Sequence, residues 1–241
     1  MTSRPLVIVQ ADEVAVMTAP LAMAAAARGY DVYDVSLSHP RTFDTEGRAP
    51  ILIYGSVALL HHWAAKTEAL RNWTFWDEAA LSPDTWASRL GNLYLNADGR
   101  RTIACEVPAG WYARPMRNAK AFTGGLSIPD NVASDTPVWA APAKRIDAEV
   151  RVFIVGGKPV AASTYQVAGQ HVRVTTDAHV DAAVQAATHA LRVWTPLRHC
   201  VADLALSDGV WRIIEFNCLN TSAWYAVDPG VVLDAFVEAE G

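Results

Sequence analysis

The sequence has little of what would assign a function at once. Its 241 residues include three cysteines, Cys105, Cys200 and Cys218, which lie far apart and form no CxxC pair. A disulfide framework or a zinc knuckle is therefore not indicated, and we expect the reducing cytoplasm as the compartment. No HExxH or GxSxG motif is present either. Covalent catalysis and a histidine metal site have no support in the sequence.

Long apolar runs and an excess of positive charge are also missing. The longest apolar stretch, residues 17–27, is rich in alanine and too short to span a bilayer. It lacks a basic leader, and a strand-like run at 6–9 precedes it, which disfavours a signal peptide. A formal net charge of -5 provides no basic field that would attract nucleic acid or an anionic membrane. We therefore expect a small-molecule or peptide substrate and no nucleic-acid or membrane partner, and the oligomeric state stays open.

What the sequence does contain is enough apolar residues, 51%, for a sizeable core. In the first third, the alternation of apolar runs predicts a parallel α/β unit, with Thr18 as a helix N-cap and Gly29 as a C-cap. Neither a GxGxxG nor a P-loop sequence follows the first strand, so those nucleotide sites are not supported. The expected elements are strands at 6–10, 31–35 and 51–54 and helices at 18–28 and 57–65.

From about Trp111 onward the sequence becomes rich in short β-type runs. Gly156-Gly157 separates two of them and is a strong hairpin signal, because adjacent glycines allow positive φ. A second hairpin is expected around Ser207-Asp208-Gly209. The expected elements of this half are strands at 149–155, 158–165, 200–206 and 211–217 and helices at 178–193 and 229–238.

The second hairpin carries an acidic face. Strand alternation places Ile213, Glu215 and Asn217 on one face, opposite Ile214 and Phe216. Asp203, on the preceding strand, lies across from Glu215 if the turn has three residues, whereas a two-residue turn would shift the register by one. Two carboxylates and an amide oxygen are hard ligands that suit Mg²⁺. The alternative is the polar face of an ordinary half-exposed hairpin.

Basic residues gather earlier in the chain. Arg114, Arg117 and Lys120 precede the turn Thr123-Gly124-Gly125, where cations and approachable backbone N–H groups suit a phosphate. The alternative is an exposed basic loop.

A strand face near the middle of the chain carries opposite charges. Glu149 and Arg151 share this face, where they form either a surface ion pair of little energetic value or a carboxylate that orients an arginine toward phosphate. Arg173 is a further candidate for a phosphate contact.

Taken in order, these segments resemble the ATP-grasp superfamily over roughly residues 111–240. The resemblance is closest to a compact branch of bacteria and phages whose site has two arginines and a lysine. It implies an α/β (α+β) fold: an N-terminal parallel α/β domain, residues 1–108, followed by an ATP-grasp fold of two α+β subdomains, residues 109–241. The segments that carry the resemblance are Arg114-Pro115, 120–124, 149–153, 156–158, 201–203 and 215–217.

The resemblance also implies cofactors and roles. ATP and Mg²⁺ are the expected cofactors, and the expected metal ligands are Asp203, Glu215 and Asn217. The expected reaction is carboxylate–amine ligation through an acylphosphate, with an ATP-dependent kinase or phosphotransferase, or a nonenzymatic nucleotide-binding protein, as alternatives. Arg114, Lys120 and Arg151 are the expected catalytic residues. The residues expected at the nucleotide are Arg117, Lys120, Thr123, Gly124, Glu149, Arg151 and Arg173, with the backbone of Val138, Trp139 and Ala140 at the adenine.

Overall fold

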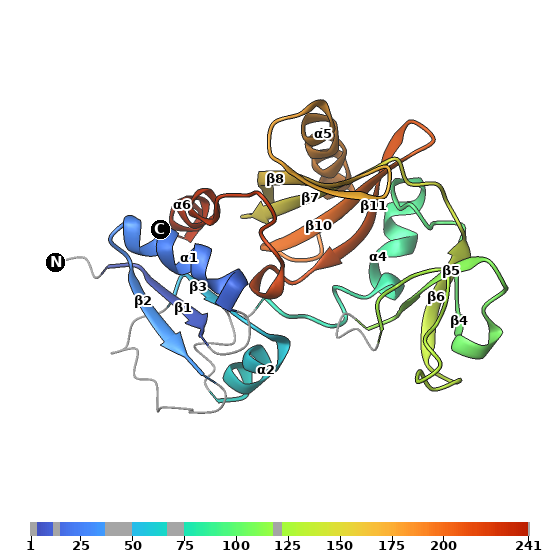
Figure 1. The fold of residues 1–241 in the computed structure, drawn as a ribbon, viewed down its shortest axis with the longest axis horizontal. Helices are drawn as coiled ribbons and strands as arrows, with labels where there is room; N and C mark the ends of the chain where they lie inside the picture. The colour runs from blue at the N-terminus through green and yellow to red at the C-terminus, as the bar shows by residue number, and fades with distance from the viewer. Residues whose placement is uncertain (1–3, 12–14, 37–49, 67–74, 118–121, 241) are drawn as a thin grey trace.

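Three sheets organise the part of the chain that the computed structural model describes, residues 4–11, 15–36, 50–66, 75–117 and 122–240. Figure 1 shows the N-terminal sheet at one end of the molecule, a small sheet at the other end and the largest sheet between them. The order of the sheets in space therefore places two α+β layers beside each other, behind an N-terminal unit.

The N-terminal sheet is parallel, as expected. Its strands β1 (Leu6–Gln10), β2 (Asp31–Val35) and β3 (Leu52–Tyr54) lie in the order β2-β1-β3, with helices α1 (Ala15–Ala27) and α2 (Val57–Lys66) as connections. The left-handed backbone of Gly29, with φ +71°, ends α1, which confirms the predicted C-cap. The predicted N-cap at Thr18 is wrong, because α1 already begins at Ala15 and Thr18 is buried within it.

The central sheet is antiparallel, with the order β11-β10-β7-β8-β9. The turn at Gly156-Gly157, with φ values of +61° and +76°, confirms the predicted hairpin. Sequence patterning missed β9, because β8 continues beyond Tyr165 into a second positive-φ turn at Ala168-Gly169. The strands are β7 (Ala148–Val155), β8 (Lys158–Val167), β9 (Gln170–Val174), β10 (Cys200–Ser207) and β11 (Val210–Asn217).

Helices cover both faces of this sheet. Helix α5 (Ala178–Val193), capped by the Asp177 side chain at the Val180 N–H, buries its alanine-rich face against the sheet in one apolar cluster. The opposite face packs through Phe153 and Val201 against the N-terminal sheet and α6 (Pro229–Glu240). Both helices match their predictions closely. The central sheet is thus clamped on each side, which fixes the strands that carry the site.

The small sheet has the antiparallel order β4-β6-β5, and α4 (Pro83–Leu90) precedes it in the chain. Since β4 lies before residue 108, this sheet takes strands from both sides of the predicted domain boundary, and the division at 108 stays a prediction. None of the helices in the described ranges has both the length and the apolar character of a membrane span. The strands are β4 (Arg100–Ile103), β5 (Trp111–Pro115) and β6 (Pro137–Pro142). The 3-10 turns are Gly91–Leu93, Ala104–Glu106 and Leu219–Thr221.

Candidate functional site

The hairpin of β10 and β11 owes its register to a bulge. Its turn has only two residues, Asp208-Gly209, with φ values of +51° and +74°. Such a turn alone would put Asp203 and Glu215 out of line. A β-bulge corrects this, because Leu204 pairs with Ile213 while its neighbour Asp203 pairs with Glu215. The expected pairing is present, although the expected three-residue turn is wrong.

The bulge also changes which side chains share a face. Ile213 and Phe216 both pack in the apolar core, whereas Ile214 and Glu215 both line a cavity. The expected grouping of Ile213 with Glu215, and of Ile214 with Phe216, is therefore wrong, because the inserted residue resets the alternation. Only the Glu215–Asn217 part of that grouping holds, as their side chains are hydrogen-bonded.

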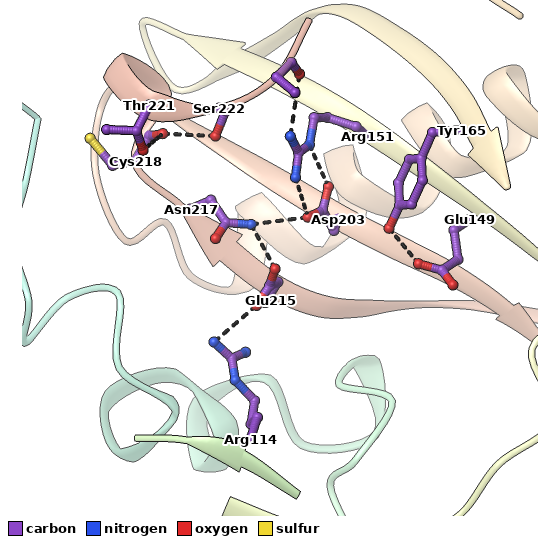
Figure 2. Close-up of polar contacts among 11 residues, drawn as sticks. Arg114, Glu149, Arg151, Tyr165, Asp203, Glu215, Asn217, Cys218, Thr221 and Ser222 are labelled. Carbon is purple, nitrogen blue, oxygen red and sulfur yellow. Dashed lines mark hydrogen bonds and ion pairs between the residues drawn. The ribbon is translucent and has the colours of Figure 1, made fainter. Parts of the chain in front are cut away.

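Asp203, Glu215 and Asn217 form one cluster (Figure 2). The Asn217 amide nitrogen donates to Asp203 Oδ2 at 3.0 Å and to Glu215 Oε1 at 2.9 Å. The side chains of Asp203 and Glu215 are only 4% and 14% exposed. The amide thus bridges two buried carboxylates that would otherwise repel each other. Within the described residues no group of three His, Cys, Asp or Glu side chains could hold a metal, so an amide has to complete any such set.

Arg151, on β7, is paired with Asp203 and not with Glu149. Its Nε and Nη2 donate to the two Asp203 oxygens at 2.8 Å each, and its Nη1 donates to the Ala223 carbonyl at 3.2 Å (Figure 2). Burial opposes the charge of the guanidinium, but the charge of Asp203 and its hydrogen bonds outweigh this, and the pKa of Arg151 lies above its ordinary value. This bidentate pair ties β7 to β10 at the floor of the site.

Arg114, on β5, reaches the same cluster from the small sheet. Its Nη2 lies 3.0 Å from Glu215 Oε2, and its guanidinium lies over the ring of buried Trp86 at 5.9 Å (Figure 2). Burial opposes its charge, but Glu215 supports it, and the pKa of Arg114 is raised. Its Nε and Nη1 are buried with no hydrogen-bond acceptor among the described residues. Buried donors of this kind are costly unless a ligand accepts from them.

A cavity of about 360 Å³ opens between the two sheets at this cluster. Its volume suits a small molecule. One part is polar, with Arg114, Asp203 and Glu215, and another part is apolar, with Leu95 and Ile146. The remaining lining residues are Asn96, Tyr112, Pro115, Thr123, Gly124, Gly125, Leu126, Lys144, Glu149, Tyr165 and Ile214.

The cavity wall at Gly124 is tightly packed. A Cβ atom at this position would overlap the Tyr112 hydroxyl and would lie 3.1 Å from the Arg114 Cβ. At Gly125 the nearest atom would be 3.9 Å away, which is ordinary contact. Burial raises the pKa of Tyr112 to about 12, so its hydroxyl stays protonated at neutral pH. Only glycine fits at position 124 with Tyr112 in place.

Glu149 faces the cavity from β7. It accepts a short hydrogen bond from the Tyr165 hydroxyl and a second bond from the Gln166 amide (Figure 2). Burial raises the pKa of Glu149. Neither expected role for Glu149, as an ion-pair partner of Arg151 or as the group that orients it, appears in the hydrogen bonds, because Arg151 turns to Asp203.

The other predicted residues are divided between the cavity and places beyond it. Thr123 and Gly124 line it, whereas Arg117 is exposed and Arg173 faces a separate hollow. Lys120 lies outside the described residues. The predicted adenine segment does not line the cavity: Val138 and Ala140 are fully buried, and the Trp139 indole N–H donates to the Asn96 carbonyl.

Sequence reasoning missed several lining residues. Tyr112 had a usable signal, because it lies two residues before Arg114 on one strand face. Lys144 and Ile146 follow β6 in an irregular segment, which carries no periodic pattern to read.

Two facing α+β layers with a shared basic and carboxylate cavity define the ATP-grasp class of fold. The chain belongs to an ATP-grasp domain family, family 3 of the clade named for two arginines and a lysine, whose model matches residues 58–238. The predicted superfamily and fold class are thereby confirmed. No curated protein matches the sequence.

Solved structures share the fold over nearly their whole length. One is the ATP-grasp ligase PsnB complexed with minimal precursor, at 15% identity and TM-score 0.56, covering 98% of this chain and 99% of that one. Another is D-alanine–D-alanine ligase from Bacillus anthracis, at 10% identity and TM-score 0.60, covering 99% and 97%. A third is a RimK domain ATP-grasp protein from Sphaerobacter thermophilus, at 14% identity and TM-score 0.58, covering 96% and 99%. At such identities the likeness concerns the fold.

Proposed function

We propose that this chain is an ATP- and Mg²⁺-dependent ligase that activates the carboxylate of an amino acid or peptide as an acylphosphate for attack by an amine. The observation that carries the proposal is the cavity that joins the open donors of Arg114 to the carboxylates of Asp203 and Glu215. Family membership supports it, as do two solved neighbours, PsnB complexed with Mg and ADP and the D-alanine ligase complexed with ATP.

The residues of the cluster fit magnesium. Asp203 and Glu215 each turn one oxygen toward the same Asn217 nitrogen, at 3.0 and 2.9 Å, so the two carboxylates converge. An asparagine amide carries an oxygen as well as an NH₂ group and can serve as a ligand in place of a donor. Mg²⁺ takes such oxygens together with water and phosphate. Asp203, Glu215 and Asn217 would hold the metal, whose charge would stabilise the transferring phosphoryl group.

The arginines fit the phosphates. The buried Nε and Nη1 of Arg114 need acceptors, and phosphate oxygens accept strongly. Arg151 uses three of its five N–H groups on Asp203 and Ala223, which leaves two for a transferring group. Thr123 and Gly124 form the wall beside Arg114, and we place the adjoining Lys120 at the phosphates as well. The apolar part of the cavity, around Leu95 and Ile146, suits an adenine ring.

The chemistry needs no protein nucleophile. A carboxylate oxygen of the substrate attacks the γ-phosphorus, the bond from that phosphorus to ADP breaks, and an amine then displaces phosphate from the acyl carbon and loses a proton. The chain's own residues bind and orient the reacting groups and exclude water from them. Arg114 and Arg151 hold positive charge at the polar end of the cavity throughout.

The test is ADP release with ATP, Mg²⁺ and pools of amino acids and peptides. We expect Glu215→Gln to retain the fold and to lower ADP release about 100-fold, since charge stabilisation at the phosphoryl group is lost. Glu238→Gln, an exposed carboxylate on α6, is the matched control and is expected to match wild type. Trapping with hydroxylamine would report the acylphosphate.

Other outcomes would point elsewhere. AMP and pyrophosphate in place of ADP would contradict the acylphosphate route. A phosphorylated product stable to hydroxylamine would favour a phosphotransferase. Binding of Mg-ATP without turnover on any acceptor would favour a nonenzymatic nucleotide-binding protein.

A further inference from the structure

A second hollow lies beside the polar end of the nucleotide cavity. It has a volume of about 370 Å³ and is lined by Tyr165, His171, Val172, Arg173 and Tyr225; we call it the tyrosine hollow. Tyr165 also lines the nucleotide cavity, so one aromatic ring separates the two spaces. A ligand in the tyrosine hollow would therefore lie next to the groups proposed to hold the transferring phosphoryl group.

The floor of the tyrosine hollow is a built aromatic platform. The rings of Tyr165 and Tyr225 stack at 4.7 Å with an angle of 9° between their planes. The Arg151 guanidinium lies over the Tyr225 ring at 4.9 Å, on the same residue that pairs with Asp203. Tyr225 has a φ of +53°, a conformation that side-chain-bearing residues rarely adopt and that concentrates at functional sites. The backbone strain holds the ring against both Tyr165 and Arg151.

The rim of the tyrosine hollow is basic. His171 and Arg173 line it, and among the described residues no carboxylate does. Within the same part of the chain, neither of these two side chains has a hydrogen-bond or ion-pair partner. Glu149 lies close enough to His171 for their charges to interact, but its two oxygens already accept from Tyr165 and Gln166. The rim therefore offers unengaged donors to an anion, above a flat surface that suits the stem carrying it.

From this placement we infer that the tyrosine hollow binds the carboxylate substrate, and that it selects a substrate with a second anionic group, held by Arg173 and His171. The ligand chemistry is that of a dicarboxylate, either free or as acidic side chains within a peptide. One carboxylate would reach past Tyr165 toward the phosphoryl group while the other stays at the rim. The inference rests on the proposed function and moves Arg173 from the nucleotide to the substrate.

The test measures probe binding by calorimetry to protein saturated with Mg²⁺ and a nonhydrolysable ATP analogue. N-acetylglutamate is compared with N-acetylglutamine, and acetyl-Glu-Glu-amide with acetyl-Gln-Gln-amide, so that the two sources of the dicarboxylate are separated. We expect the acidic member of at least one pair to bind about tenfold tighter, the value of one charge-assisted hydrogen bond. Arg173→Gln should abolish that preference and leave the affinity for the ATP analogue unchanged, whereas Arg192→Gln, an exposed arginine on α5, should change neither.

The outcomes separate the inference from the function on which it rests. Equal affinity for both members of each pair, with the analogue bound, would overturn the dicarboxylate subsite alone. Weaker binding of the analogue to Arg173→Gln would return Arg173 to the phosphates and overturn the subsite as well. Failure of the wild-type protein to bind the analogue would overturn both proposals.

Discussion

The central sheet and the small sheet each bury one arginine beside the carboxylate cluster, and the two arginines are paired to different extents. Arg151, on the central sheet, donates from Nε, Nη1 and Nη2, and two of these bonds form a bidentate pair with Asp203. Arg114, on the small sheet, contacts Glu215 through Nη2 alone, while its buried Nε and Nη1 have no acceptor among the described residues.

This difference separates a structural pair from a receptive one. A buried charge whose donors are satisfied by its own chain stabilises the fold and is costly to disturb. A buried charge with open donors is desolvated before its ligand arrives, so the ligand gains the hydrogen bonds that the fold left unmade. The central sheet is therefore the fixed floor of the site, and the small sheet is the part whose energetics depend on the nucleotide.

The largest expected effect follows from breaking the satisfied pair. Asp203→Asn keeps the side-chain volume but leaves the Arg151 guanidinium buried without its counter-charge. We expect a loss of about 3–5 kcal/mol in the free energy of unfolding, measured by chemical denaturation without nucleotide at neutral pH. Glu215→Gln, at the singly bonded Arg114, should cost less, about 1–3 kcal/mol.

An exposed pair provides the control for this comparison. Asp98 accepts from Lys144 at 2.6 Å, but its side chain is 54% exposed. Asp98→Asn should therefore change the free energy of unfolding by at most about 1 kcal/mol. Equal losses for Asp203→Asn and Glu215→Gln would remove the distinction between the two arginines.

Much of the central sheet could be predicted from the sequence, because its signals are local. Gly156-Gly157 and the period of residues 178–193 each specify an element without reference to the rest of the chain. The bulge at Ile214 could not be predicted in this way. Two-residue and three-residue turns both fit the sequence around Asp208, and only packing of Ile213 and Phe216 into one core decides the register.

The candidate site was predictable to the extent that its residues alternate on strands. Asp203, Glu215 and Asn217 come together as expected, whereas the partners of Arg151 and Arg114 depend on which sheets face each other. Contacts between distant elements have no local signature, which is why the Glu149–Arg151 pairing was expected and Arg151–Asp203 was missed.

An intermediate effect tests the receptive side. In Gly124→Ala, the new methyl group overlaps the Tyr112 hydroxyl, so the wall beside Arg114 must shift. We expect nucleotide affinity to fall about tenfold, the equivalent of a modest overpacking cost, with little change in unfolding free energy. Gly125→Ala, which meets nothing closer than 3.9 Å, is the matched control and should bind as wild type does. Adding Tyr112→Phe to Gly124→Ala should recover part of the lost affinity, and no recovery would contradict the steric explanation.

The smallest expected effect concerns Glu149, the carboxylate of the site with no arginine partner in the described ranges. Burial raises its pKa above the ordinary value of 4.5, so the folded state binds this proton more tightly than the unfolded state. The resulting stabilisation is present below pH 4.5 and is lost as the pH rises through the raised pKa, which leaves ionised Glu149 as a cost at neutral pH. Glu149→Gln should therefore raise the Tm at pH 7.5 by about 2 °C, and the difference should shrink as the pH is lowered toward 5. Glu238→Gln, exposed on α6, should show no such trend. A gain for Glu149→Gln that grows on acidification would mean that the hydrogen bonds from Tyr165 and Gln166, rather than burial, set the free energy of this carboxylate.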